Sequence, residues 1–168
     1  MKNFSKIEKM IENWLKPIPK LPKTTTKWIS DNVWWIAAIG VVVEGVGILI
    51  SITGISAISN TYTYLVPGYS TGIIFNYMIS IIFMAAILAL TAVAINPLKL
   101  MQRKGWNMLF LVLLVSAVSV FIDSILTLNI ASVILSLVFG AIIWVIGAYL
   151  LFEIREDFKK SVKSINKK

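Results

Sequence analysis

Long apolar stretches dominate the pattern of hydrophobic and polar positions along the chain. Four runs are almost free of charge: Val33–Ile58, Ile73–Ile95, Trp106–Leu128 and Ile130–Phe152. Each has at least 23 residues, which is about 35 Å of helix and enough to cross a ~30 Å hydrocarbon core. The strands of membrane barrels are about ten residues long and alternate in polarity, unlike these runs. Because helices satisfy their own backbone hydrogen bonds in lipid, the pattern predicts an all-α, four-helix transmembrane bundle.

A shorter amphipathic segment precedes the first run. In residues 3–16, apolar residues recur at helical spacing, and Lys and Glu residues fill the opposite side. This pattern is typical of a helix in the membrane interface, although such a helix can also bind a partner. Pro17, Pro19 and Pro22 then predict an extended linker that continues to Lys27. Beyond the fourth run, we expect the helix to continue with an apolar side formed by Ile154, Phe158, Val162 and Ile165.

Positive charge is confined to the ends of these segments. All 16 Lys and Arg residues fall in three clusters, within Lys2–Lys27, Lys99–Lys104 and Arg155–Lys168. Because basic residues mark the cytoplasmic side and four spans return the chain to its starting side, we expect both termini inside the cytoplasmic (inner) membrane. The predicted organisation is a cytoplasmic helix and Pro-rich linker over 1–27, a four-span domain over 28–158 and a basic tail over 159–168.

The bilayer is the first partner that this charge pattern predicts. We expect contacts with the headgroups of an anionic inner leaflet from Lys2, Lys6, Lys9, Trp14, Arg103 and Lys104. Aromatic residues at the ends of the runs suit the belts at the two membrane surfaces: Trp28, Trp34, Trp35 and Trp106 on the inside, and Tyr62, Tyr64 and Tyr69 on the outside. Membrane placement also accounts for the net charge of +8, so no nucleic-acid partner is expected.

Cysteine and histidine are both absent from the chain. Their absence excludes disulfides, His-ligated haem, the usual zinc sites and catalysis by Cys or His. The sequence also has no Gly-rich phosphate loop and no catalytic triad, and only a metal site built from carboxylates stays open. We therefore expect no catalytic residue, no cofactor and no metal site, in a protein that is not an enzyme.

A stripe of small and polar residues lies inside the first run. Its members recur every three or four residues and so share one face of the helix. Small residues let helix backbones approach each other in lipid, and polar residues can bond across the contact. The stripe predicts a helix-packing seam at Gly40, Gly47, Ser51 and Gly54. Weaker seams are predicted at Ala85, Ala89 and Ala92, at Ser116, Ser119 and Asp123, and at Ser136, Gly140 and Gly147.

Glu44 stands near the middle of that stripe, about 16 Å from Val33 along the helix. An ionisable residue in the membrane is costly and marks a candidate functional site. Because no Lys, Arg or His lies in any run, desolvation favours the neutral acid, hydrogen-bonded across the seam. Two other roles stay open, namely a proton or cation site and pairing with a charged residue of a partner.

Asp123 is the second acidic residue inside the runs. It lies close to the outer end of its helix, where the cost of a charge falls, and Ser119, Ser124 and Thr127 are possible hydrogen-bond partners. We predict a structural role. The estimated depths of Glu44 and Asp123 differ by about 10 Å, so the two do not form an acid–base pair.

Two aromatic and aliphatic motifs lie in the second half of the chain: Gly105-Trp-Asn-Met-Leu-Phe110, which opens the third run, and Gly147-Ala-Tyr-Leu-Leu-Phe-Glu-Ile-Arg155, which closes the fourth. In these motifs the chain resembles small four-span membrane proteins of unassigned function from bacteria with small genomes. The resemblance implies four helices and a bacterial inner membrane. It implies no activity and no catalytic residue.

Two hypotheses for the function follow from these patterns. The first is a non-enzymatic scaffold or accessory subunit, which packs through its Gly/Ser seams in a homo-oligomer or with other membrane protein subunits. The alternative is a small transporter or channel that uses Glu44 to bind a proton or cation. Crosslinking in membranes and flux in liposomes distinguish the two.

Overall fold

The computed structural model describes residues 2–62, 69–126 and 130–158, with side chains placed for 5–57, 74–126 and 133–158. In these ranges the chain forms the helices α1 (Lys2–Leu15), α2 (Lys23–Tyr62), α3 (Tyr69–Lys99), α4 (Arg103–Leu126) and α5 (Ile130–Glu153). A further short helical turn covers 155–158. The described residues include no strand. The prediction of an all-α fold is confirmed.

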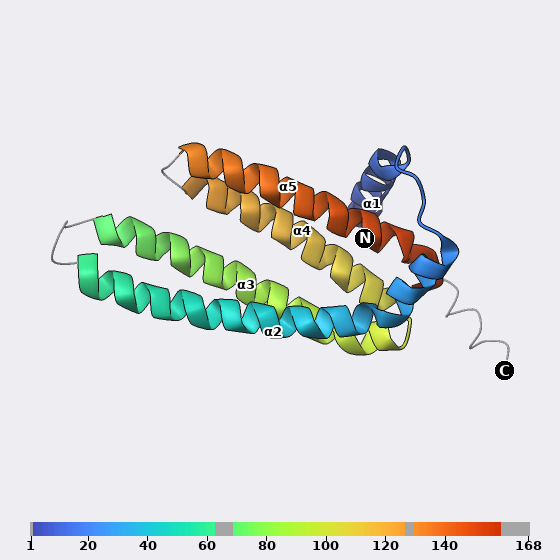
Figure 1. The fold of residues 1–168 in the computed structure, drawn as a ribbon, viewed down its shortest axis with the longest axis horizontal. Coiled ribbons are helices and arrows are strands. Elements are labelled where there is room, and N and C mark those ends of the chain that lie inside the picture. Colours follow the sequence, from blue (N-terminus) through green and yellow to red (C-terminus); the bar gives the residue numbers. More distant parts are fainter. Residues whose placement is uncertain (1, 63–68, 127–129, 159–168) are drawn as a thin grey trace.

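Four helices are long and apolar enough to cross a membrane. The qualifying segments are Lys23–Ala57, Ile74–Lys99, Arg103–Leu126 and Val133–Glu153. They correspond to the four apolar runs of the sequence and form a four-helix bundle (Figure 1). The protein is therefore an integral, multi-pass membrane protein.

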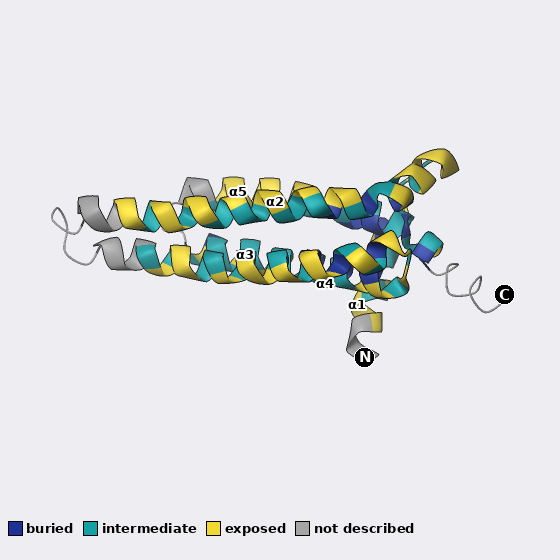
Figure 2. Ribbon diagram, turned by 90° about the horizontal axis from the view of Figure 1, so that it is seen from below, coloured by how far each residue is buried: buried dark blue, intermediate teal, exposed yellow. Residues whose placement is uncertain are grey.

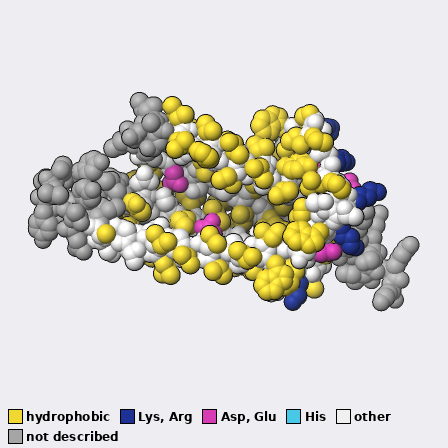
Figure 3. All heavy atoms as spheres, viewed as in Figure 1, with side chains coloured by type: hydrophobic (Ala, Val, Ile, Leu, Met, Phe, Trp, Pro, Cys, Tyr) yellow, Lys and Arg dark blue, Asp and Glu magenta, His cyan; other side chains and the backbone are white. Residues whose placement is uncertain are grey.

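Helices that follow each other in the chain are neighbours in space. The helix α2 packs on α3, α3 on α4 and α4 on α5, and the long axes are nearly parallel (Figure 1). The helix α1, the start of α2, the short connection from α3 to α4 and the end of α5 lie together at one end. We call this the basic end, because the Lys and Arg side chains gather there in Figure 3. The opposite part is called the far half.

The helix α1 lies across the basic end of the bundle instead of along it (Figures 1 and 2). Ile11 and Leu15 are buried against the rest of the protein, whereas Lys6, Lys9 and Asn13 are exposed. If the four long helices cross the membrane, a helix in this orientation runs along the membrane surface.

The hydrophobic core is concentrated at the basic end, where the buried residues gather in Figure 2. The far half is the part of the bundle beyond Ala37 on α2, before Thr91 on α3, beyond Leu113 on α4 and before Ala148 on α5. Among its described residues, Ser124 has the only buried side chain. Its apolar side chains face outward, as is expected where lipid surrounds the helices. The core consists of Ile11, Leu15, Val33, Ala37, Ala94, Leu98, Trp106, Phe110, Leu113, Ala148, Leu151, Ile154 and Phe158.

The boundary between the linker and the first span differs from the prediction. The linker was expected to reach Lys27, but α2 begins at Lys23, directly after Pro22. The Pro22 carbonyl accepts a hydrogen bond from the Thr26 amide at 3.0 Å. Proline favours helix starts because its φ angle is already helical and its missing N–H is not needed there. This start overrides the weaker helix propensity of the three threonines that follow.

The end of α5 also differs from the expected continuous amphipathic helix. A turn at Ile154 interrupts the helix before residues 155–158, and Ile154 and Phe158 are buried in the core. Their apolar side is therefore covered by the protein itself. Val162 and Ile165 lie outside the described residues.

Candidate functional site

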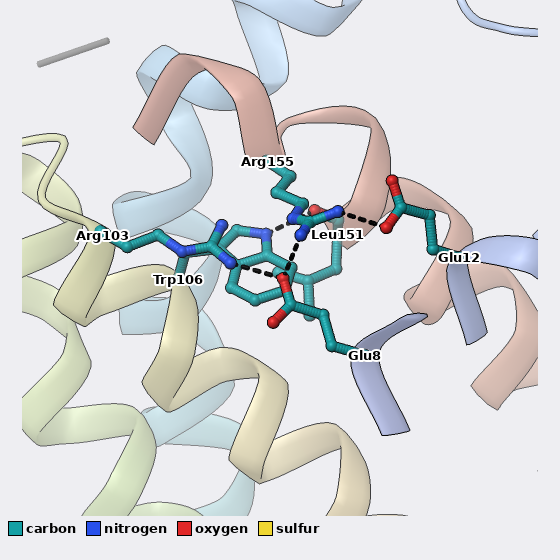
Figure 4. A network of polar contacts seen from close by, with 6 residues as sticks. All are labelled: Glu8, Glu12, Arg103, Trp106, Leu151 and Arg155. Carbon is teal, nitrogen blue, oxygen red and sulfur yellow. Dashed lines mark hydrogen bonds and ion pairs between the residues drawn. The ribbon is translucent and has the colours of Figure 1, made fainter. Parts of the chain in front are cut away.

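An ion-pair network connects α1 to the bundle at the basic end (Figure 4). One oxygen of Glu8, Oε1, lies 2.6 Å from Nη2 of Arg103 and 2.5 Å from Nη2 of Arg155. The other terminal nitrogen of Arg155 lies 2.7 Å from Oε2 of Glu12. The two arginines come from α4 and from the turn after α5, so one glutamate of α1 joins three separate parts of the chain.

Trp106 stands at the centre of this network. Its ring is fully buried, stacks on Phe110 with centroids 5.3 Å apart, and meets the edge of Phe152 at 5.6 Å. The Arg103 guanidinium carbon lies 3.9 Å from the ring centroid, within the range of a cation–π contact. Its indole N–H donates to the Leu151 carbonyl at 2.7 Å. Trp106 was predicted for the inner aromatic belt, but here it forms part of the core.

A second indole hydrogen bond joins α4 and α5 in the opposite direction. Trp144 of α5 donates its N–H to the Leu113 carbonyl of α4 at 2.8 Å, while Trp106 of α4 donates to Leu151 of α5. The bonds are reciprocal, so they fix both the rotation and the register of α4 against α5.

The segment between α1 and α2 is also tied to the end of α5. The Tyr149 hydroxyl donates to the Pro19 carbonyl at 2.7 Å, and the Leu21 amide donates to Oε2 of Glu153 at 3.0 Å. Within α2, the buried Ser30 hydroxyl donates to Oδ2 of Asp157 at 2.5 Å. These bonds hold the linker in a defined path.

The arginines carry more donors than this network satisfies. Nη1 of Arg103 and Nε of Arg155 are buried and have no hydrogen-bond partner among the described residues. Arg103, predicted to contact lipid headgroups, has a side chain that is 25% exposed, and its guanidinium contacts Glu8 and Trp106. The sequence does contain a signal for the network, because Arg103 and Arg155 are its only two arginines, and arginine is the residue best suited to such multiple pairing.

The other residues predicted to contact headgroups lie around this end. Lys6, Lys9, Trp14 and Lys104 are all exposed. The side chain of Lys2 lies outside the described part of the structure. Trp14 is 68% exposed, so its ring is free to reach the lipid surface on which α1 would lie.

Glu44 is half-buried on α2, in the middle of the membrane-spanning length. Among the described residues, no hydrogen bond or ion pair is formed by its carboxyl group. Acidic side chains are visible among the apolar ones midway along the face shown in Figure 3. Glu44 is thus a polar group in the far half for which the described part of the protein supplies no partner.

Asp123 has a different environment. Its Oδ1 accepts a hydrogen bond from the Ser80 hydroxyl of α3 at 2.8 Å, and its Oδ2 accepts one from Ser119 at 3.3 Å. Ser119 was a predicted partner, whereas Ser124 instead donates to the Val120 carbonyl. Asp123 therefore joins α3 to α4, and the structure does not pair it with Glu44.

Three of the four predicted seam residues on α2 face α3. A Cβ built on Gly47 would lie 2.6 Å from Cε of Met84, and one built on Gly54 would lie 3.7 Å from the Tyr77 ring. The Ser51 hydroxyl lies 4.0 Å from the Met84 sulfur. Gly40 differs, because a Cβ there would have no neighbour within 4 Å.

The weaker seams are divided in the same way. On α5, Gly140 faces Val120 and Gly147 faces Leu113, both of α4, and the Ser136 hydroxyl lies 3.3 Å from that of Ser124. On α3, by contrast, the side chains of Ala85, Ala89 and Ala92 are exposed. One predicted small-residue face is therefore used within the bundle, and another is left uncovered.

Two cavities open near the basic end. The basic cleft has a volume of about 570 Å³ and lies between the N-terminal segment and the end of α5; the apolar groove has a volume of about 270 Å³ and lies between α2, α4 and α5. The cleft is lined by Glu12, Leu15, Lys16, Ile18, Lys20, Leu21, Lys23, Thr26, Lys27, Phe152, Glu153, Arg155, Glu156 and Asp157. The groove is lined by Ile29, Val33, Ile36, Leu109, Val112, Leu113, Ser116, Gly147, Leu150, Leu151 and Ile154.

No cluster of three or more acidic residues that would hold a metal ion occurs among the described residues. No protein-family model matches the sequence, and no curated protein or solved structure is detectably similar to it. The function must therefore be inferred from the chain's own residues.

Proposed function

We propose that the protein is a non-enzymatic scaffold or accessory subunit, which assembles with a second copy or another membrane protein through the side of α2 that carries Gly40 and Glu44. The Glu44 carboxyl group supports this most directly, because it has no partner among the described residues. A polar group in lipid is costly unless it finds a partner, and such residues mark functional contacts. A neighbouring subunit can supply the missing donor.

The surface around Glu44 suits close helix packing. A Cβ on Gly45 would contact Leu88 and one on Gly47 would contact Met84. In antiparallel helices of equal rise, these contacts place Glu44 near the level of Ala89 and Gly40 near that of Ala92. Gly40 has open space beside it and both alanines are exposed. Small residues at such a surface let the backbone of a partner helix approach.

We also propose that the basic end faces the cytoplasm of a bacterial cell, in the cytoplasmic (inner) membrane. This orientation is supported by the position of the described Lys and Arg residues at one end of the bundle (Figure 3), because basic residues mark the cytoplasmic side. A single cysteine introduced at Lys16, in a chain without native cysteine, is expected to react with a membrane-impermeant thiol reagent only after the cells are opened. Reaction in intact cells would show that the basic end faces the outside of the cell.

Thiol crosslinking in native membranes tests the assembly. Gly40 and Ile143 each lie at the middle of a membrane-spanning segment, and the Ile143 side chain is 69% exposed on α5. We expect Gly40→Cys to form a defined crosslinked dimer or heteromer, and the matched control Ile143→Cys to stay uncrosslinked. Equal crosslinking of both variants, or a strictly monomeric wild type in membranes and in lipid nanodiscs, would contradict the proposal.

Substitution of Glu44 tests the role of its carboxyl group. Glu44→Gln keeps the ability to hydrogen-bond, whereas Glu44→Leu removes it. We expect assembly to persist in the glutamine variant and to weaken by about threefold to twentyfold in the leucine variant, since one interhelical hydrogen bond in lipid contributes about 0.6–1.7 kcal/mol. Unchanged assembly of Glu44→Leu would show that Glu44 is not part of the interface.

Transport of a proton or cation by Glu44 is the alternative function. Neither the basic cleft nor the apolar groove is lined by Glu44, so neither of these cavities leads to the carboxyl group, and assembly is the better-supported proposal. In liposomes, we expect the purified protein to give no proton or cation flux that depends on Glu44, so Glu44→Gln should change nothing. Such a flux would favour transport.

A further inference from the structure

The charged groups of the basic cleft divide into paired and unpaired sets. Of its four carboxylates, Glu12 forms an ion pair with Arg155. Glu153 accepts a hydrogen bond from the Leu21 amide and Asp157 accepts one from the Ser30 hydroxyl, and these neutral donors leave the carboxylate charges in place. The four lysines of its lining form no ion pair within the described part of the chain. These are Lys16, Lys20, Lys23 and Lys27. The cleft therefore presents unpaired ammonium groups to a ligand.

The start of α2 adds to the positive potential. Lys23 and Thr26 both line the cleft and belong to the first turn of this helix. The first amide groups of a helix have no carbonyl partner within it and carry a partial positive charge. The Thr26 amide already donates to the Pro22 carbonyl, so a ligand can use only the amides that precede it. Phosphate groups bind well in such a setting.

The apolar groove is lined by residues of the same two helices, α2 and α5, that contribute to the cleft. On α2, Thr26 of the cleft is followed at helical spacing by Ile29, Val33 and Ile36 of the groove. On α5, the groove residues Leu150, Leu151 and Ile154 lead to Arg155 and Asp157 of the cleft. The only hydroxyl of the groove, that of Ser116, donates to the Leu113 carbonyl of its own helix. The groove thus offers an apolar surface whose lining residues are close in sequence to those of the charged cleft.

We propose that the basic cleft and the apolar groove together form a binding site for one anionic phospholipid. The lysines and the start of α2 hold the phosphodiester headgroup, and an acyl chain lies in the groove between α2 and α5. The cleft matches the charge of such a headgroup, and the groove lies within the membrane-spanning length of these helices. A lipid bound there would close the side of the bundle on which α2 and α5 do not pack directly, and would hold the linker and α1 in place.

Lipid retention by the full-length protein in detergent tests this site. Phosphatidylglycerol and phosphatidylcholine with identical chains are added, and bound lipid is counted by native mass spectrometry. We expect one phosphatidylglycerol to be retained, and its affinity to fall by about 100-fold in the variant Lys20→Gln, Lys23→Gln, Lys27→Gln, since each Lys near a bilayer surface strengthens binding of anionic lipid by about fivefold. The matched control Lys6→Gln, Lys9→Gln, Lys104→Gln removes the same charge outside the cleft and should retain the lipid.

A groove variant separates headgroup binding from chain binding. Ser116→Phe fills the groove and leaves every cleft residue in place, so we expect it to lower retention as well. The proposal is overturned if both lysine variants lose lipid equally, if phosphatidylcholine is retained equally well, or if inorganic phosphate displaces the lipid at equal concentration. Thermal unfolding of each variant in the same detergent identifies any loss of lipid that is due only to misfolding.

Discussion

The basic end and the far half of the bundle are held together by different interactions. The basic end has a buried core, stacked aromatic rings and an ion-pair network that joins α1 to α4 and to the turn after α5. The far half has small residues at helix contacts, a few hydroxyl bonds and outward-facing apolar side chains. Water next to the membrane surface drives apolar burial, whereas lipid gives helices no such drive to associate.

We therefore expect the stability of the bundle and its assembly with other proteins to depend on different residues. Substitutions at the basic end should affect whether the bundle and α1 hold together, because the core and the charge network lie there. Substitutions in the far half should affect stability little, and those near Glu44 should affect which proteins the bundle contacts. Four variants with matched controls test this division, from the largest expected effect to the smallest.

Loss of the central indole should have the largest effect. Trp106→Ala removes a fully buried ring, its stacking on Phe110 and its hydrogen bond to Leu151. We expect a loss of about 3–5 kcal/mol in the free energy of unfolding, as for other buried large-to-small substitutions. Unfolding in mild detergent, followed by circular dichroism, measures it. Trp28, which is 63% exposed, is the control, and Trp28→Ala should cost less than about 0.5 kcal/mol.

Loss of the bridging carboxylate should release α1. Glu8→Gln removes the charge that pairs with both Arg103 and Arg155, and we expect α1 docking to weaken by about 1.5–3 kcal/mol, the usual contribution of hydrogen bonds to charged groups. A single cysteine at the buried Ile11 reports docking through its alkylation rate. Lys9→Gln, on the exposed side of α1, should leave that rate unchanged. An unaltered rate in Glu8→Gln would show that burial of Ile11 and Leu15 alone holds α1.

Gly105 and Gly47 face neighbours of different rigidity, the first a backbone segment and the second a flexible side chain. A Cβ on Gly105 would lie 2.7 Å from the Leu98 backbone nitrogen, whereas a Cβ on Gly47 would meet the flexible end of Met84 at 2.6 Å. We expect Gly105→Ala to destabilise the bundle by about 1–3 kcal/mol. Gly47→Ala should cost much less, because the Met84 side chain can rotate away. Equal costs in thermal unfolding would contradict the division between the two halves.

The smallest effect is expected at the hydroxyl bond between α3 and α4. Ser80→Ala removes the hydrogen bond to Asp123, and we expect a loss of about 0.6 kcal/mol, the average for side-chain bonds between membrane helices. Ser56→Ala serves as the control, since Ser56 is exposed and donates only to the Ile52 carbonyl of its own helix. A loss above about 2 kcal/mol would show that this hydrogen bond contributes more than bonds between membrane helices usually do.

Hydropathy predicted the four spans because each apolar run exceeds the thickness of the bilayer by itself. The helix α1 could be predicted for a similar reason, since its period of apolar residues is local. The start of α2 at Lys23 could not, because the prolines before it and the three threonines after it favour an extended chain by propensity. Trp106 was placed in the aromatic belt because an indole at the start of a span suits that belt, and only its neighbours Phe110, Phe152 and Leu151 show that it is buried.

For the candidate sites too, the sequence identified the residues but not their contacts with other helices. The sequence identified Glu44 and Asp123 as the two carboxylates inside the apolar runs, and identified Gly47, Ser51 and Gly54 as small or polar residues on one helix face. It did not indicate that Ser80 of α3 would reach Asp123, or that Gly40 would lack a neighbour while the rest of the seam faces α3. These outcomes depend on how each helix is rotated about its axis, which a smooth apolar surface does not specify.

The sequence by itself determined the class of the protein, the number of its spans and the gathering of its basic clusters on one side. Each depends on a property of a single segment, either its transfer into lipid or its charge. The tertiary structure decided which residues of different segments meet. Glu8 meets Arg103 and Arg155, Asp123 meets Ser80, and Glu44 forms no hydrogen bond or ion pair among the described residues. Such meetings depend on helix rotation, register and the path of the linker, which are set by many weak contacts acting together.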